Sequence, residues 1–160
     1  MFQIGDKVVY PMHGAGVIES VERQEILGEM KDYYVLRLPT KNMKVMLPID
    51  RVEKLGVRYI MKRGEFEIAM EIFHQAPTEM SHNWNRRYRE NMERIKSGKV
   101  DDLISVIRDL QLLDTEKGLS TGEKKMLNDA KQIFKSELFL VLDQTEINVE
   151  KLIVDAIANN

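Results

Sequence analysis

The chain's one tryptophan lies in a short basic run, residues 83–91, where Trp84 is followed by Arg86, Arg87 and Arg89. Guanidinium groups donate paired hydrogen bonds to phosphate oxygens, and an exposed aromatic ring stacks on a base or inserts into an opened base step. These residue types in this spacing therefore favour contact with a nucleic-acid backbone.

The helical phase of this run leaves two positions open for the tryptophan ring. At about 100° per residue, Trp84 falls on the same stripe as Tyr88 and Met92, and this alone favours a ring packed in the core. However, Asn83 is a suitable N-cap, and a side chain at the first helical position can extend past its stripe and stay accessible. The free N–H groups at such a helix end also attract phosphate.

Charge is distributed unevenly along the chain. The formal net charge is only −2, but residues 81–99 hold six lysines and arginines against two acids, and residues 65–80 hold four acids and no base. A patch with about four net positive charges makes only a few phosphate contacts. We therefore expect weak, salt-sensitive DNA binding that needs a second anchoring surface.

No residue pattern indicates an enzyme, a metal site or a cofactor. The chain has no cysteine, which excludes disulfides, thiolate nucleophiles and cysteine zinc sites. Its three histidines have no ligand spacing, and no Ser-His-Asp or paired-carboxylate arrangement stands out. His13 adjoins a Gly-x-Gly turn, but a strand-like segment follows it instead of the helix that a dinucleotide loop requires. We expect a non-enzyme without catalytic residues.

The amino terminus lacks a basic segment followed by an apolar one, and no run of eighteen apolar residues occurs. The expectation is a cytoplasmic protein that does not enter a membrane. A hydrophobic content of 43% over 160 residues is enough for real cores in one ordinary domain or two small ones.

Short strand-like segments fill roughly the first sixty residues. β-branched and aromatic residues recur there with partial alternation and are interrupted by glycine or proline. Hairpin turns are expected at Gly28 and Glu29 and across residues 39–42. The predicted strands are 7–10, 16–22, 33–38 and 43–47, with a last strand and the joint between Gly56 and Gly64. They predict a small antiparallel five-stranded β-barrel of the Tudor or SH3-like kind.

Beyond residue 64 the apolar residues follow a helical period. Residues 120–123 have the spacing of a capping box, Gly118 is suited to close the preceding helix, and Thr145 is suited to open the last one. We expect five helices and therefore an α+β protein of two domains, at 1–62 and 63–160. The absence of a Ser- or Pro-rich linker predicts limited freedom between them.

The fourth predicted strand ends at Pro48, which cannot donate to a ladder and is typical of a sheet edge. An edge with exposed Met46 and Leu47 accepts the strand of a partner. In the alternative, Val45 and Leu47 point inward and Met46 only covers surface.

An ordered set of short motifs spans nearly the whole chain. These motifs occupy residues 5–11 with 13–16, then 34–36, 46–48, 83–91, 108–110 and 119–127. Together they resemble the CarD/CdnL family of bacterial transcription regulators. The resemblance implies a Tudor-like amino-terminal domain, shared with the transcription-repair coupling factor, that binds the RNA polymerase β subunit. It also implies a compact helical domain that contacts promoter DNA.

The resemblance also implies roles for particular side chains toward DNA. Trp84 wedges into the minor groove at the upstream edge of the melted region and stabilises the open complex. The adjacent phosphate contacts are Arg86, Arg87 and Arg89, and a further basic position that faces DNA is Lys124 with Lys125. Contact with DNA is then largely independent of sequence, and promoter choice comes from the polymerase.

On the barrel, the resemblance assigns a polymerase-binding surface to Gln24, Ile26, Met46, Leu47 and Pro48. Gln24 and Met46 stand where some relatives carry arginine, so the contact with polymerase is expected to be less electrostatic here. A monomer is expected, located at the nucleoid through RNA polymerase.

Two other functions are compatible with the same residues. A protein-only adaptor would bind polymerase through residues 46–48 and leave DNA untouched. An RNA- or ribosome-associated barrel protein would combine strands with a basic helix and bind RNA without polymerase.

Overall fold

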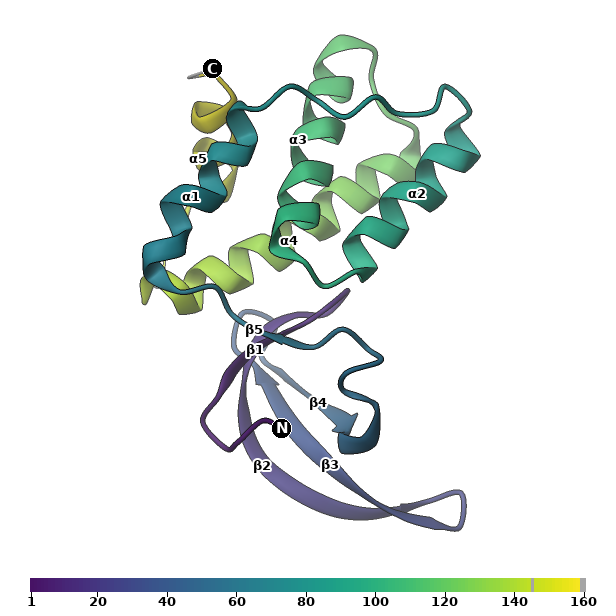
Figure 1. Ribbon diagram of the computed structural model, residues 1–160, viewed down its shortest axis with the longest axis vertical. Helices are drawn as coiled ribbons and strands as arrows, with labels where there is room; N and C mark the ends of the chain where they lie inside the picture. The colour runs from purple at the N-terminus through teal and green to yellow at the C-terminus, as the bar shows by residue number, and fades with distance from the viewer. Residues whose placement is uncertain (145, 159–160) are drawn as a thin grey trace.

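The computed structural model describes residues 1–144 and 146–158 of the chain. Within these residues, five strands come first and five α-helices follow, which confirms the predicted α+β fold (Figure 1). The strands are β1 (Lys7–Tyr10), β2 (Gly14–Ile26), β3 (Glu29–Leu38), β4 (Met43–Pro48) and β5 (Arg58–Tyr59). The helices are α1 (Phe66–Met70), α2 (Trp84–Lys96), α3 (Val100–Glu116), α4 (Thr121–Leu142) and α5 (Val149–Ala158). Short 3-10 helices lie at Ile49–Arg51, Arg63–Glu65 and Glu71–His74.

The strands form one antiparallel sheet in the order β4-β3-β2-β1-β5, and this sheet is open. β5 has two residues and pairs with β1, so β4 and β5 remain the two edges of the described sheet. The five predicted strands are confirmed, but the closure that a barrel requires is not formed. Val52 and Val57, between β4 and β5, instead cover the inner face of the sheet around Tyr34 and Leu36.

Strands β2 and β3 are longer than predicted and form a hairpin that projects away from the rest of the sheet (Figure 1). Its turn is made by Leu27 and Gly28, which both have positive φ, so the turn lies one residue earlier than predicted. The outer half of the hairpin, residues 21–30, is exposed to solvent. The second predicted turn is confirmed, since Lys41 N donates to Leu38 O at 3.2 Å.

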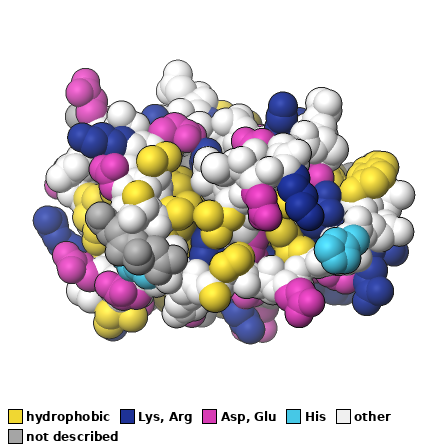
Figure 2. Space-filling model, turned by 90° about the horizontal axis from the view of Figure 1, so that it is seen from above, with side chains coloured by type: hydrophobic (Ala, Val, Ile, Leu, Met, Phe, Trp, Pro, Cys, Tyr) yellow, Lys and Arg dark blue, Asp and Glu magenta, His cyan; other side chains and the backbone are white. Residues whose placement is uncertain are grey.

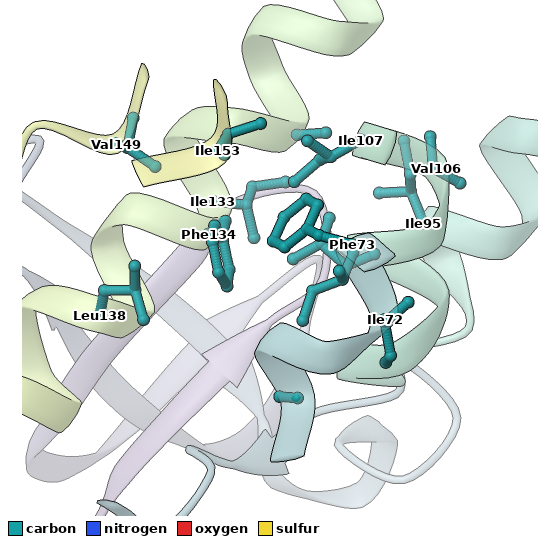
Figure 3. Close-up of a cluster of buried hydrophobic side chains, with 14 of the residues drawn as sticks. Ile72, Phe73, Ile95, Val106, Ile107, Ile133, Phe134, Leu138, Val149 and Ile153 are labelled. Carbon is teal, nitrogen blue, oxygen red and sulfur yellow. The ribbon is translucent and has the colours of Figure 1, made fainter. Parts of the chain in front are cut away.

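The helices enclose a hydrophobic core that reaches into the sheet (Figure 3). Phe73 and Phe134 meet edge to face at its centre, with ring centroids 6.0 Å apart. Val9 and Ala15 of the sheet pack into the same core, whereas Val8 faces the inner side of the sheet. Neighbouring residues of a strand point to opposite faces, so β1 is buried on both sides. The division of the chain at residue 62 stays a prediction.

The end of α3 and the start of α5 lie close to their predicted positions. Gly118, with φ +82, donates its N–H to the carbonyl oxygens of Leu113 and Asp114 at 3.1 Å each and closes α3. α5 begins at Val149 after Asn148, whose Oδ1 accepts a hydrogen bond from Lys151 N at 3.0 Å. Thr145, the predicted opening of this helix, lies outside the described residues. Among the described residues, none of the helices combines the length and apolar character that a membrane span needs.

Two side chains of α4 hold the helices against the sheet. Ser136 Oγ accepts a hydrogen bond from the backbone N–H of Ala15 at 2.8 Å, and the carboxylate of Glu137 accepts one from Met61 N at 2.8 Å. Gly14 has φ +116, and a Cβ at this position would approach Ser136 Oγ to 2.9 Å, so glycine is needed for this contact. The sheet and the helices are therefore in direct contact through α4.

Candidate nucleic-acid interface

Trp84 is the first residue of α2, and the residue is 56% exposed. Asn83 is the N-cap, because its Oδ1 accepts a hydrogen bond from Arg86 N at 3.1 Å. The helix is packed through the residues that follow, with Ile95 buried and Tyr88 half-buried against the helical core. The core position that periodicity favoured for Trp84 is therefore wrong. A helix's first side chain has no preceding turn to pack over, and this explains the difference.

The guanidinium of Arg87 points into the protein. Its Nε and Nη2 donate to the two carboxylate oxygens of Glu123 at 2.7 and 2.8 Å, and its Nη1 donates to Ser81 O at 3.3 Å. The two side chains are only 15% and 1% exposed. The predicted phosphate contact of Arg87 conflicts with this geometry, because its fork-shaped donor face is already occupied by a carboxylate.

The same carboxylate contacts the N-cap of α4. Ser120 Oγ accepts a hydrogen bond from Glu123 N at 3.2 Å, so the predicted N-cap is confirmed. Glu123 Oε1 accepts from the Ser120 hydroxyl at 2.9 Å and not from the Ser120 backbone N–H, so the reciprocal half of the predicted capping box is not formed. The hydrogen bonds from Arg87 hold the pKa of Glu123 below its usual value, although burial acts to raise it. Glu123 thus joins the start of α2 to the start of α4, on one side of the helical domain (Figure 1).

Four cationic side chains near these two helix starts are exposed. Arg86 and Lys125 each pair with an acid one turn later on their own helix, at 2.8 Å. Such exposed i,i+4 pairs are worth only about 0.3–0.5 kcal/mol, so both groups can exchange their partner for a phosphate. Arg89 and Lys124 are exposed and make no ion pair with any residue that the structure describes. Basic and acidic side chains are interspersed on the helical end of the molecule (Figure 2), as expected for weak binding to DNA.

A buried ion-pair network positions the segment that leads into Trp84. Asp109, on α3, accepts hydrogen bonds from Arg108 Nε at 3.0 Å, from Arg94 Nη1 at 3.1 Å and from Thr78 N at 3.0 Å. These contacts hold Thr78 and the last turn of α2 on α3. Sequence reasoning missed the positioning roles of Asp109 and Glu123. Asp109 adjoins the apolar stripe predicted for its helix, and this position was the available sign that its carboxylate is buried and paired.

The polymerase-binding residues predicted by resemblance lie along β4 and the outer part of β2. β4 is an edge strand, as predicted, and Met46 on it is 39% exposed. Leu47 is fully buried opposite Tyr34 and cannot face a partner, which is a correction to its predicted role. The structure thus supports the inward orientation of Leu47 and leaves Met46 and the half-buried Pro48 on the surface.

Gln24 and Ile26 are exposed on the projecting hairpin. In the sheet register Pro48 lies opposite Tyr33, and Gln24 lies opposite Lys31, so the hairpin continues past the end of β4. The predicted polymerase-binding surface therefore consists of the β4 edge and the longer β2–β3 hairpin beside it.

Family models match both halves of the chain. The model described as the CarD-like/TRCF RID domain matches residues 2–61, and the model described as the CarD C-terminal domain matches residues 68–154. The chain is 39% identical over 150 residues to a protein of Bacillus subtilis (strain 168) named "Putative transcription factor YdeB", and the match covers 94% of this chain and 98% of that protein. A solved structure, the 72-residue N-terminal domain of Myxococcus xanthus CarD, is 29% identical with a TM-score of 0.33. That match covers 37% of this chain and 79% of the solved one.

Proposed function

The chain belongs to the CarD/CdnL family of transcription-associated proteins that interact with RNA polymerase, and from this we propose that it stabilises the promoter open complex with Trp84. In this proposal the sheet domain docks on the polymerase β subunit. The ring of Trp84 then enters the minor groove at the upstream edge of the melted DNA.

The observation that carries the proposal is the exposed ring of Trp84 beside two helix amino termini. Helix starts present free N–H groups and a positive dipole end, and both favour phosphate. The exposed cations near the two helix starts are Arg86 and Arg89 on α2 and Lys124 and Lys125 on α4. An apolar wedge surrounded by phosphate-binding groups is the arrangement that minor-groove proteins use to hold an unstacked step.

Differential binding gives the wedge its effect. A closed duplex must first be unstacked, at about a few kcal/mol per step, before it accepts the ring, whereas an opened fork accepts it directly. The protein therefore binds the open promoter more tightly than the closed one and slows collapse of the bubble. Few cations contribute, so DNA affinity is sufficient only when polymerase docking raises the effective concentration at the fork.

Docking on polymerase is assigned to the β4 edge. An edge strand offers unpaired N–H and C=O groups to a partner strand, and Met46 adds an exposed apolar contact there. No arginine stands at position 24 or 46, so this contact rests on strand pairing and apolar burial more than on charge.

Replacing the wedge tests the proposal. We expect Trp84→Ala to shorten the lifetime of competitor-challenged open complexes by about tenfold, since base–aromatic stacking contributes about 1–3 kcal/mol. Polymerase binding and thermal stability should stay near those of the unaltered protein, because Trp84 is 56% exposed. An unchanged lifetime with polymerase still bound would rule out the wedge and favour the protein-only adaptor.

A charge on the strand edge tests the docking surface. We expect Met46→Asp to weaken binding to RNA polymerase by about tenfold, because the charge must be desolvated where an apolar side chain was buried. Ile68→Asp, at a side chain that is 73% exposed on α1, is the matched control and should leave binding unchanged. Equal affinities of the two variants in a direct binding titration would place the docking surface elsewhere.

A further inference from the structure

A cavity of about 500 Å³ opens on the inner side of the sheet, where the chain passes from β4 to β5. Its walls include Phe2, Tyr34 and Tyr59, and its other lining groups include Asp50, Glu53 and Arg58. Ile49 and Asp50 also line the cavity and directly follow the last residue of β4. The cavity therefore adjoins the end of the β4 edge assigned to polymerase, but its lining does not include Met46 or Pro48.

Aromatic rings form one side of the cavity. The ring of Phe2 meets that of Tyr59 edge to face with centroids 5.0 Å apart, and it meets that of Tyr34 at 6.2 Å. The Tyr34 hydroxyl accepts a hydrogen bond from Phe2 N at 3.1 Å and donates to Phe2 O at 3.0 Å. The amino-terminal segment is thereby held in place, and the exposed ring of Tyr59 stays available to a ligand.

Arg58 is the one cationic side chain in the described lining of the cavity, and it is already paired with an acid. Arg58 donates both terminal nitrogens to the carboxylate of Glu137 at 2.8 Å, and its remaining donors are directed to Gly98 O and Tyr59 O. The two acidic side chains of the lining, by contrast, are not neutralised by a close partner among the described residues. Asp50 has one distant contact, 3.9 Å to Lys31, and Glu53 pairs with no residue in the described part of the chain. The acidic side chains that line the cavity therefore outnumber its one basic side chain.

We infer that this cavity binds an arginine side chain of a partner polypeptide. A guanidinium stacks on aromatic faces and donates to carboxylates in the same plane, so Tyr59 with Phe2 and Asp50 with Glu53 supply both kinds of recognition. The site adjoins the end of β4, but it uses none of the residues assigned to the proposed DNA and polymerase contacts, and it adds a further attachment point to the protein. The inference does not depend on the proposed function.

Titration with a single blocked residue tests the inference in the full-length protein. Nα-acetyl-arginine methylamide, added to the ¹⁵N-labelled chain, should shift amide signals grouped at Phe2, Asp50, Glu53 and Tyr59. The neutral isostere Nα-acetyl-citrulline methylamide should bind about tenfold more weakly, because it lacks the charge for the cation–π contact and for the ion pairs. Equal binding of the two probes, or shifts spread over all acidic surfaces, would overturn the inference.

Variants assign the recognition to the named groups. Asp50→Asn with Glu53→Gln should weaken binding of the arginine probe by about five- to tenfold, whereas Glu67→Gln with Glu71→Gln, two exposed acids on the helical side, should not. Tyr59→Leu removes the exposed ring, and Phe2→Leu serves as a second aromatic variant if Tyr59→Leu alters the fold. Unchanged affinity in both the acid and the aromatic variants would reject the site.

Discussion

Glu137→Gln is expected to lower the free energy of unfolding by about 3 kcal/mol, since breaking one half of a buried ion pair costs about 3–5 kcal/mol. The carboxylate is fully buried and accepts hydrogen bonds from Arg58 Nη1, Arg58 Nη2 and Met61 N, each at 2.8 Å. Glutamine keeps the size but loses the charge and turns an N–H₂ group toward donors. The lower end of the range applies because Arg58 is 22% exposed and regains some water.

Urea unfolding measures this effect, and a matched exposed pair supplies the control. Glu90→Gln breaks the pair with Arg86, whose side chains are 49% and 68% exposed, and should change stability by no more than about 0.5 kcal/mol. Arg58→Lys should not substitute for arginine, because a single ammonium cannot match the two-pronged contact. A loss below about 1 kcal/mol for Glu137→Gln would mean that the pair of Glu137 with Arg58 contributes little to the junction between the sheet and the helices.

The junction matters because the proposed function needs both ends of the molecule at once. Docking through β4 raises the effective concentration of Trp84 at the fork only if the connection holds the ring within reach. Glu137 and Ser136 tie α4 to β5 and β2, and Glu123, at the other end of the same helix, ties it to α2. A single helix therefore links the sheet to the helix that carries the tryptophan.

Local chemistry was predictable from the sequence wherever it depends on neighbouring residues. The N-caps at Asn83 and Ser120 and the end of α3 at Gly118 are all confirmed. Each rests on side-chain hydrogen bonds or positive φ within a few residues, which spacing alone specifies.

Features that depend on residues far apart were not predictable in this way. Arginines are distributed all around α2, and only the position of α4 decides that Arg87 faces Glu123, 36 residues later. The outer part of β2 was missed because residues 22–25 are polar and lack the alternation of a half-buried strand. Closure of the sheet depended on the length of β5, which pattern does not reveal.

The second large effect is expected for Arg87→Ala, which should also lower the free energy of unfolding by about 3 kcal/mol. This substitution leaves the carboxylate of Glu123 buried with only Ser120 as a partner. A double variant, Arg87→Leu with Glu123→Gln, removes both charges and should recover most of that loss, since glutamine still serves the cap. Urea unfolding of the two singles and the double gives the coupling energy. Additive losses would mean that the two side chains do not stabilise each other.

The contribution of Glu123 to folding stability should depend on pH with opposite sign in the unaltered chain and in Arg87→Ala. In the unaltered chain the pKa of Glu123 lies below its usual value of 4.5, so the unfolded state binds more protons. The stabilisation is full above pH 4.5 and is lost as the pH falls below it. In Arg87→Ala, burial without the guanidinium raises the pKa of Glu123, so this variant gains stability from Glu123 protonation as the pH is lowered toward 4.5. The stability difference between the two should shrink on acidification, and a constant difference would contradict the pairing.

The same double variant separates a positioning role from a phosphate contact. If Arg87 acts by holding α2 on α4, restoring stability with Arg87→Leu and Glu123→Gln also restores open-complex lifetime and leaves its salt dependence unchanged. If Arg87 contacts phosphate, the double variant folds but stays defective, and the slope of log affinity against log salt falls by about one. Arg89→Ala, at an exposed cation on the same helix, provides the reference for a lost phosphate contact. A lifetime defect that persists in the stable double variant would return Arg87 to the DNA surface.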